Sequence, residues 1–488
     1  MKKVLAKGTI YLMSAQLIFL IGGYAIHFGL GRYLGPELYG TFGVIISLLT
    51  ICRVLVESGT MRAVSKYTAE RRELAVGIKN QTMKIQIILA LIIFVFLFTL
   101  APLIANLLKD STLTSYIRFI AFFIPISSLY GVYFGLLNGI RAFGKQATIS
   151  IIYEAIKVLA VFVLVFLGFK VYGAISGYLM AAIVSLIMAR HYWISKGREY
   201  IGVTGNFEMK KIIKFATPII LFSLAFNLVI SLDLFFVKAI LSEKAQAGFY
   251  TSAAALSKVP YFIFLALSST LFPSIAKSTS DKGNEELTKS YINQSLRYTL
   301  IFLIPCAFII SATSQNLISL VYTGGYLTAA SPLSILIFGL TFLCLFIILT
   351  TVITASGKPK VSLAMVLVLL LVNIVLNRTL VSIYGLTGAA VATTITGFLG
   401  VLIAGIYVYN RFHSLTSLLS LFRILAASSI IYIIVCIFSV SGIALIGYYI
   451  GLLLIYFALL FAFREIRKED IQVAKNIFSG LRKSRSQS

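Results

Sequence analysis

Seven charged side chains stand inside apolar stretches that are long enough to cross a membrane, and they are the first candidates for chemistry. These are Arg53, Glu57, Glu154, Lys157, Asp233, Lys258 and Arg378. A charged group at the centre of a bilayer costs about 2.5 to 3.5 kcal/mol even on lenient insertion scales, so each should face a wet cavity or a partner. The cations are suited to holding an anion and the acids to holding a proton or a cation. No catalytic residue is predicted.

Two of the acid–base pairs have helical spacing. Arg53 and Glu57 are four residues apart, and Glu154 and Lys157 are three apart, so the members of each pair share a helix face. Each pair lies near one end of its apolar stretch and can be read as a local ion pair at the membrane interface. In the functional interpretation, Arg53 and Lys157 are cavity cations that bind substrate, and the glutamates are their charge partners.

Lys258 is the leading single candidate for substrate binding. It lies about ten residues into its apolar stretch and directly precedes Val259-Pro260, where a proline can kink a helix. An intramembrane cation beside a kink indicates a binding site. Arg378 lies near a helix end and is either a fourth cavity cation or a side chain that extends to the interface.

Asp233 has a different potential role, because a lone intramembrane acid can relay a proton or hold Na⁺. Pairing with Lys238, five residues further on, is the simpler interpretation. Three histidines and four cysteines without a CxxC spacing predict neither a metal site nor a disulfide framework. We therefore expect no cofactor. Such an acid would couple transport to an Na⁺ or H⁺ gradient or to the membrane potential.

The elements that carry these charges are predicted to be transmembrane helices. The 488-residue chain is 59% hydrophobic and only 12% charged, whereas soluble domains are about 25% charged. A span needs about 20 apolar residues. About fourteen such stretches occur, at 9–30, 39–56, 85–105, 117–138, 150–168, 173–190, 215–237, 249–275, 298–318, 331–353, 361–380, 385–409, 424–440 and 442–463. The sequence thus predicts an all-α integral membrane protein.

Loop charge predicts the orientation of these spans. With a cytoplasmic N-terminus, the cytoplasmic loops and both termini hold 32 of the 42 Lys and Arg residues, and the opposite loops hold five. Basic residues are enriched in cytoplasmic loops, so a multi-pass protein of the cell membrane with both termini in the cytoplasm is expected. The same bias, with attraction to anionic lipid headgroups, accounts for the net charge of +26 without nucleic-acid binding.

A repeated pattern predicts two related halves. Gly144-Lys145 is followed 27 residues after the lysine by Tyr172-Gly173, and Gly357-Lys358 is followed 26 residues after its lysine by Tyr384-Gly385. Six spans per half return the chain to the same side, which gives parallel repeats with the substrate between them. The expected organisation is a six-helix lobe at 1–196, a cytoplasmic linker at 197–214, a second six-helix lobe at 215–410, appended helices at 411–463 and a basic cytoplasmic tail at 464–488.

The sequence resembles the polysaccharide-transport flippases, within the multidrug/oligosaccharidyl-lipid/polysaccharide exporter superfamily. Gly31 to Gly40 (GRYLGPELYG) is similar to their first external loop, and Arg62 to Glu70 to the basic loop after their second span. Ser257 to Pro260 and Leu271 to Lys277 also resemble the eighth helix of lipid II flippases, which carries a cavity cation, although the cation here stands closer to the first proline. The resemblance implies two lobes around a central cavity that opens alternately to each face.

The function expected on this basis is a flippase for a polyprenyl-pyrophosphate-linked oligosaccharide. It would move that lipid from the cytoplasmic to the outer leaflet for cell-surface polysaccharide or O-antigen export, as a monomer working with membrane lipids, a glycan polymerase and glycosyltransferases. The alternative is a cation-coupled multidrug exporter of the same superfamily. A membrane glycosyltransferase is disfavoured, because the external loops contain no acidic pair.

Overall fold

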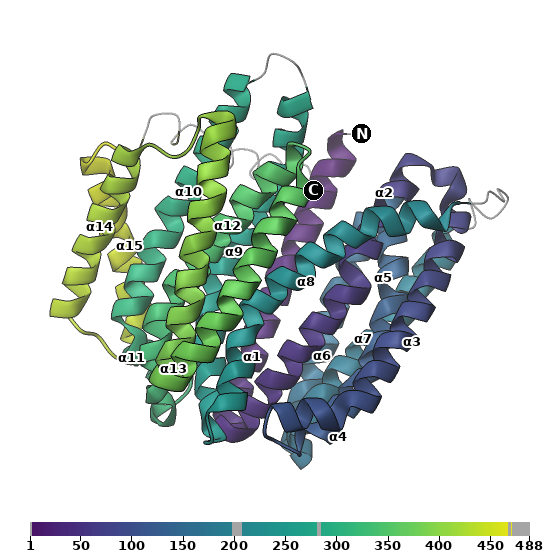
Figure 1. Ribbon diagram of the computed structural model, residues 1–488, viewed down its shortest axis with the longest axis horizontal. Helices are drawn as coiled ribbons and strands as arrows, with labels where there is room; N and C mark the ends of the chain where they lie inside the picture. Colours follow the sequence, from purple (N-terminus) through teal and green to yellow (C-terminus); the bar gives the residue numbers. More distant parts are fainter. Residues whose placement is uncertain (1, 198–206, 281–284, 467–469, 471–488) are drawn as a thin grey trace. The chain divides into compact units, whose positions relative to one another are not determined.

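The fold is helical, as the apolar stretches predict. The computed structural model describes residues 2–197, 207–280, 285–466 and 470, and none of these residues lies in a strand. The predicted linker therefore falls partly outside the described residues, at 198–206, and so does most of the predicted tail, at 467–469 and 471–488. Figure 1 shows the chain from the purple N-terminal helix to the yellow C-terminal hairpin.

The first half of the chain forms seven α-helices with short irregular turns between them. They are α1 (Lys2–Arg53), α2 (Gly59–Glu70), α3 (Ala75–Leu107), α4 (Leu113–Ala121), α5 (Phe123–Gly139), α6 (Phe143–Leu164) and α7 (Lys170–Gly197). The π-helical turns η1 (Val54–Ser58) and η3 (Val165–Phe169) follow α1 and α6, and the 3₁₀ turn η2 (Arg72–Leu74) precedes α3.

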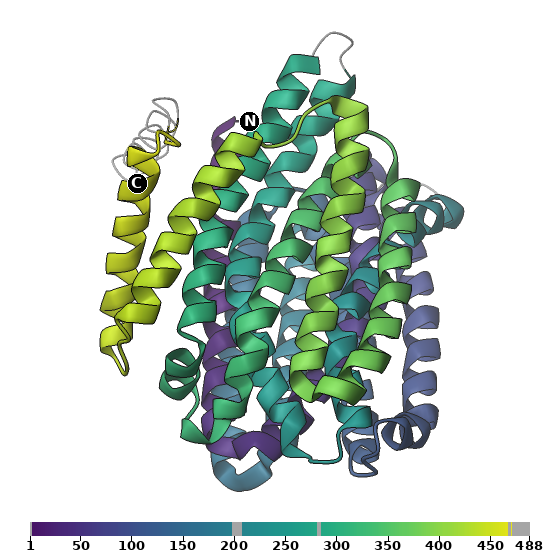
Figure 2. The ribbon, with the colours of Figure 1, turned by 60° about the vertical axis from the view of Figure 1, so that its left-hand side comes forward.

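The second half continues with longer helices and ends in a hairpin. It contains α8 (Met209–Ile240), α9 (Ala245–Ser280), α10 (Glu285–Ala312), α11 (Ser314–Val321), the 3₁₀ turn η5 (Gly324–Ala329), α12 (Ala330–Ala355), α13 (Pro359–Phe412), α14 (Leu418–Ile437) and α15 (Ala444–Ala462). Helices α14 and α15 lie side by side in Figure 2, joined by a short turn that contains Gly442 with φ of 68°. The predicted separation of the stretches 424–440 and 442–463 is thereby confirmed.

The described residues contain ten helical segments that are long and apolar enough to cross a membrane. Three of them, at Tyr11–Glu70, Phe143–Lys196 and Pro359–Phe412, have 54 to 60 residues. Each of these three is broken at a glycine with positive φ, namely Gly35, Gly168 and Gly385. The all-α membrane fold class is thus confirmed, and the count of fourteen spans stays a prediction.

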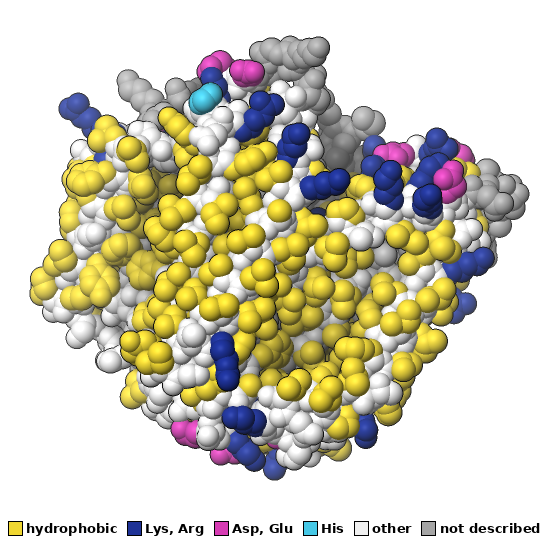
Figure 3. Space-filling view, in the orientation of Figure 1, with side chains coloured by type: hydrophobic (Ala, Val, Ile, Leu, Met, Phe, Trp, Pro, Cys, Tyr) yellow, Lys and Arg dark blue, Asp and Glu magenta, His cyan; other side chains and the backbone are white. Residues whose placement is uncertain are grey.

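Side-chain burial on α3 shows what surrounds these helices. Its buried positions include Thr82, Gln86 and Ala90, whereas Leu91 and Ile92 are exposed. A helix in water would bury its large apolar side chains, so this inverted pattern is that of a helix facing lipid. On the face drawn in Figure 3, hydrophobic side chains cover the middle of the helices and basic side chains gather at helix ends.

The residues group into two compact units. The first comprises Met1–Leu256, Val321–Pro332 and Pro359–Thr396, and the second comprises Ser257–Leu320, Leu333–Lys358 and Gly397–Ser488. The first unit contains all of the predicted N-terminal lobe together with segments of the predicted second lobe, and the lobe boundaries remain predictions.

Backbone geometry places the internal repeat three residues away from the match seen in the sequence. Lys170 (φ 47°, ψ −127°) and Gly385 (φ 57°, ψ −132°) adopt the same unusual conformation. Three residues after each, Gly173 and Gly388 pack so closely on the end of the preceding helix that a Cβ would overlap its backbone. The structural equivalents are therefore Lys170-Val-Tyr-Gly173 and Gly385-Leu-Thr-Gly388, rather than the two Tyr-Gly pairs.

Candidate functional site

The Glu154–Lys157 pair lies on one face of α6 and is almost completely buried. The two side chains are 1% and 3% exposed, and Lys157 Nζ stands 2.8 Å from Glu154 Oε2. The spacing of three residues on a helix brings the groups together, as expected. Among the described residues, none donates a hydrogen bond to either Glu154 oxygen beyond this ion pair. The ion pair expected from this spacing is therefore confirmed, and both side chains are buried in the protein.

Aromatic rings enclose the Lys157 ammonium on several sides. Its Nζ lies 4.9 Å from the ring centroid of Phe19 on α1, 5.1 Å from that of Tyr178 on α7 and 5.5 Å from that of Tyr153 on α6. Ring faces attract cations, and the attraction grows when water is excluded. We call Lys157, Glu154 and these three rings the inner site.

The Arg53–Glu57 pair forms at the junction of α1 and the π turn η1. Arg53 Nε donates to Glu57 Oε1 at 3.1 Å, and Nη2 donates to Oε2 at 3.0 Å. Gln86 of α3 donates to the Val56 carbonyl within η1 and so helps to fix the turn. π-helical turns are frequent at functional sites because they redirect side chains. The two side chains are 31% and 14% exposed, and we call this pair the outer site.

The inner and outer sites are neighbours. Arg53 interacts electrostatically with Lys157 and with Tyr153, and Tyr130 of α5 interacts with both Arg53 and Glu57. Four of the seven predicted charges thus come together from α1, η1 and α6. Their formal charges cancel, because each cation has one carboxylate partner. Such a cluster can bind an anion through its two cations when the anion displaces the carboxylates from them.

Asp233 on α8 is buried and does not pair with Lys238, so the simpler expectation for this acid was wrong. Asp233 Oδ2 accepts hydrogen bonds from the hydroxyls of Tyr250 at 2.7 Å and Thr393 at 3.3 Å. All three residues are at most 3% exposed. Five residues advance a helix by about 500°, which turns Lys238 away from Asp233.

Lys238 instead pairs with an acid that sequence reasoning missed. Its Nζ stands 2.7 Å from Asp110 Oδ2, in the loop between α3 and α4. Burial opposes ionisation of Asp110, but hydrogen bonds from Lys238 and Thr112 outweigh it and lower the pKa of this carboxyl. Asp110 lies beside Lys109 in a short polar loop, and only packing brings it to α8.

The last two predicted cations differ in their surroundings. Lys258 on α9 is half-buried and belongs to the second unit, and it has an interaction partner. Arg378 on α13 is exposed, which favours the interpretation that it extends to the interface. In the part of the chain that the structure describes, no group of His, Cys, Asp and Glu is placed to hold a metal ion.

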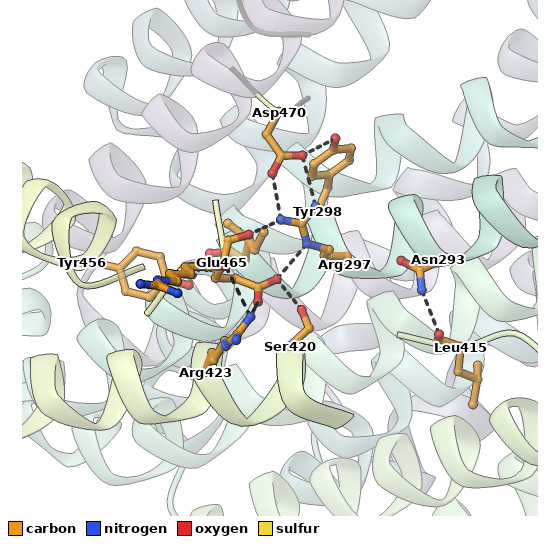
Figure 4. A network of polar contacts seen from close by, with 11 residues as sticks. Asn293, Arg297, Tyr298, Leu415, Ser420, Arg423, Tyr456, Glu465 and Asp470 are labelled. Atoms are coloured by element: carbon orange, nitrogen blue, oxygen red, sulfur yellow. Dashed lines mark hydrogen bonds and ion pairs between the residues drawn. The ribbon is translucent and has the colours of Figure 1, made fainter. Parts of the chain in front are cut away.

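A second buried charge network, absent from the predicted site residues, ties the C-terminal segment to α10. Arg297 donates through Nε to Glu465 and through Nη1 and Nη2 to Asp470, at 2.7 to 3.1 Å, and through Nη2 to the Glu465 carbonyl as well. Ser420 and Arg423 of α14 also donate to the Glu465 carboxylate, and Tyr298 donates to Asp470. Figure 4 shows these side chains converging around Arg297.

Comparison with known proteins gives the family. The family model described as polysaccharide biosynthesis protein matches residues 5–279, and the model described as MatE matches residues 218–379. Lipid II flippase MurJ of Bacillus subtilis is 22% identical, covering 83% of this chain and 79% of that protein. The probable low-salt glycan biosynthesis flippase Agl15 of Haloferax volcanii is 22% identical over 75% of each chain.

The solved structures show the same fold. A structure described as lipid II flippase MurJ in an inward closed conformation has a TM-score of 0.75 at 19% identity, covering 96% of this chain and 99% of the other. The first family model spans more than half of the chain. The protein therefore belongs to the polysaccharide biosynthesis protein family of the multidrug/oligosaccharidyl-lipid/polysaccharide exporter superfamily, whose matched members are membrane transporters and flippases rather than enzymes.

Proposed function

We propose that this transporter is a flippase for an oligosaccharide linked to a polyprenyl pyrophosphate. It moves the lipid from the cytoplasmic to the outer leaflet by alternating access. The observation that carries the proposal is the cluster of Arg53 and Lys157 with their carboxylates inside the membrane-spanning part. The names of the relatives, a lipid II flippase and a probable glycan flippase, support the same substrate class.

The chemistry of a diphosphate suits the two cations. The diphosphate loses much of its hydration in transit, and Arg and Lys replace that water with charge-assisted hydrogen bonds. Arg53 is the more accessible of the two, so it would meet the diphosphate first. Its planar guanidinium can bind two phosphate oxygens at once, whereas Lys157 offers a compact point charge. Lys258 remains a third candidate cation.

Asp233 is proposed as the group that couples transport to an ion gradient. Its carboxylate is buried on α8 and is held by hydroxyls from α9 and α13. A buried carboxylate with hydroxyl ligands is suited to a proton or to Na⁺. Asn373 and Asn377 are also fully buried on α13, and Asn373 donates a hydrogen bond to Thr396, three residues after Thr393. Replacing Asp233 by Asn should abolish any dependence of transport on the gradient.

Contacts on the side predicted to be external suggest how that face is closed. Asp110 pairs with Lys238 there, and the α1 segment at Pro36 to Gly43 packs on the start of α9. Gly40, Gly43 and Gly248 allow this crossing, because a Cβ at any of them would overlap the opposite helix. We propose that these contacts separate when the substrate is released outward.

A transport assay in liposomes tests the proposal. Purified protein is reconstituted with a fluorescent short-chain polyprenyl-diphosphate disaccharide, and the lipid reaching the outer leaflet is measured by lectin binding. Wild type should expose the lipid faster than protein-free liposomes, and Arg53→Ala should slow it about tenfold, as expected when a charge-assisted contact worth about 1.4 kcal/mol is lost. Lys211→Ala, at an exposed lysine, is the matched control. Equal rates with and without protein would refute the proposal.

The alternative of a cation-coupled multidrug exporter keeps one specific support, the MatE match over residues 218–379. Overexpression in a drug-sensitive host decides between the two functions. A rise in resistance to organic cations, together with no lectin-detected transport, would favour the exporter. Unchanged susceptibility is expected from the flippase.

A further inference from the structure

Glu154 is the least satisfied carboxylate among the buried acids described above. At 1% exposure its single charged partner is Lys157, and its oxygens receive no other hydrogen bond in the described part of the chain. The side chain packs directly on Gly22 of α1, where a Cβ would overlap the carboxyl group. Ionised Glu154 therefore depends on one ammonium for its stability.

Lys157 has a second role available to it, because the proposed substrate is an anion. The ammonium is already close enough to Arg53 for the two positive charges to repel each other. A diphosphate beside Arg53 would offer Lys157 a doubly charged partner in place of one carboxylate. If Lys157 turns to the diphosphate, Glu154 is left as an unpaired buried charge, which is costly enough that the group takes up a proton instead.

We propose that Glu154 is a proton-linked positioning residue: binding of an anionic headgroup draws Lys157 away, and Glu154 accepts a proton from solvent water as the ammonium leaves. The inference rests on the proposed function, since it needs an anionic substrate. No covalent bond to the substrate forms or breaks. One proton passes to the Glu154 carboxylate on binding and returns to water on release.

Among the titratable groups of the two sites, Glu154 is the acid that we expect to take up a proton when the anion binds. Glu154 interacts with Lys157 and Tyr153 on its own helix and with Tyr178 on α7. The neighbouring outer site adds Arg53 and Glu57, with Tyr130 of α5 beside them. Tyrosines stay neutral near pH 7 and Arg53 stays charged. Glu57 is 14% exposed and accepts two hydrogen bonds from Arg53, so it is less isolated than Glu154. The aromatic faces retain Lys157 when no anion is bound.

Calorimetry with geranyl diphosphate on the full-length protein in detergent tests this inference. Titrations in two buffers of different ionisation enthalpy give the number of protons taken up per ligand. Wild type should take up about one proton more than Glu154→Gln. Because binding and protonation are reciprocally linked, wild-type affinity should rise up to about tenfold per pH unit lowered, relative to that variant. Glu208→Gln, at an exposed carboxylate outside both sites, should keep the wild-type proton uptake.

Lys157→Met provides a second test that does not require the Glu154 variant to fold. Without the ammonium, Glu154 is already protonated before ligand arrives, so binding should be weaker and the extra proton uptake should vanish. Equal proton uptake in wild type, Glu154→Gln and Lys157→Met, with binding retained, would overturn the inference and leave the flippase proposal standing. No heat of binding from wild type at any pH would overturn both.

Discussion

Two buried carboxylates in this protein have similar exposure and opposite hydrogen bonding. Glu465 and Glu154 are 2% and 1% exposed. Glu465 is bonded to Arg297, Arg423 and Ser420, whereas Glu154 is bonded, within the described part of the chain, to Lys157 alone. A fully bonded ionic network specifies one arrangement of helices. A carboxylate with a single partner changes state when that partner leaves. On this difference we expect the C-terminal network to be structural, and we propose a functional role for the inner site.

Breaking the C-terminal network should have the largest effect on stability. Arg297→Met removes the cation that bonds both Glu465 and Asp470 and should cost about 3 to 5 kcal/mol, as is typical when one partner of a buried ion pair is removed. Thermal unfolding in detergent measures the loss. Protein that folds at low temperature should still transport. Unchanged stability would mean that the network is dispensable for folding, so Glu465 and Glu154 would no longer differ in their structural role.

Breaking the inner site should affect transport more than stability. Lys157→Met lets Glu154 protonate, so the loss of stability should be about half that of Arg297→Met or less. Transport in the liposome assay should fall about tenfold or more, which corresponds to at least about 1.4 kcal/mol. Losses of stability equal to those of Arg297→Met would show that the inner site is a structural pair as well.

Geometry at the outer site should matter less than charge. Arg53→Lys keeps a cation but loses the two-point contact with Glu57, so transport should fall about three- to tenfold. Unfolding temperature should change little, because the pair is partly exposed. A variant with wild-type transport would indicate that Arg53 acts through its charge alone.

The contribution of the Asp110–Lys238 pair to stability should depend on pH. The pKa of Asp110 is lowered from its ordinary value of 3.8 in the folded protein. The pair therefore stabilises the fold above that ordinary value, and the contribution is lost as pH falls through the lowered pKa. Asp110→Asn should lower stability by about 1 kcal/mol at pH 7 and have no added effect near pH 2. Thermal unfolding at the two pH values measures this, and equal losses at both would contradict it.

Arg378→Ala should have the smallest effect. The side chain is exposed on α13, and surface substitutions usually change stability by less than about 0.5 kcal/mol. Transport should match wild type in the liposome assay. A tenfold loss of transport would return Arg378 to the set of cavity cations.

Interactions between residues close in sequence could be predicted, and interactions between distant residues could not. Apolar stretches and the glycines between them are local features, so the helices and their breaks were predictable. Arg53–Glu57 and Glu154–Lys157 were also predictable, because helical spacing alone brings them together. Asp110 and Lys238 are 128 residues apart and Arg297 and Glu465 are 168 apart, and nothing in one sequence links them. Glu465 lay in a segment expected to be a plain basic tail.

The cancellation of charge in the two neighbouring sites has an electrical consequence. Arg53, Glu57, Lys157 and Glu154 together carry no net formal charge when the site is empty. Moving one elementary charge through the membrane field takes about 2.3 kcal/mol per 100 mV, so these residues add no such work to the return of an unloaded carrier. With a diphosphate bound and Glu154 protonated, the same residues carry one positive charge that offsets part of the lipid's negative charge. The loaded and unloaded steps should therefore respond differently to voltage.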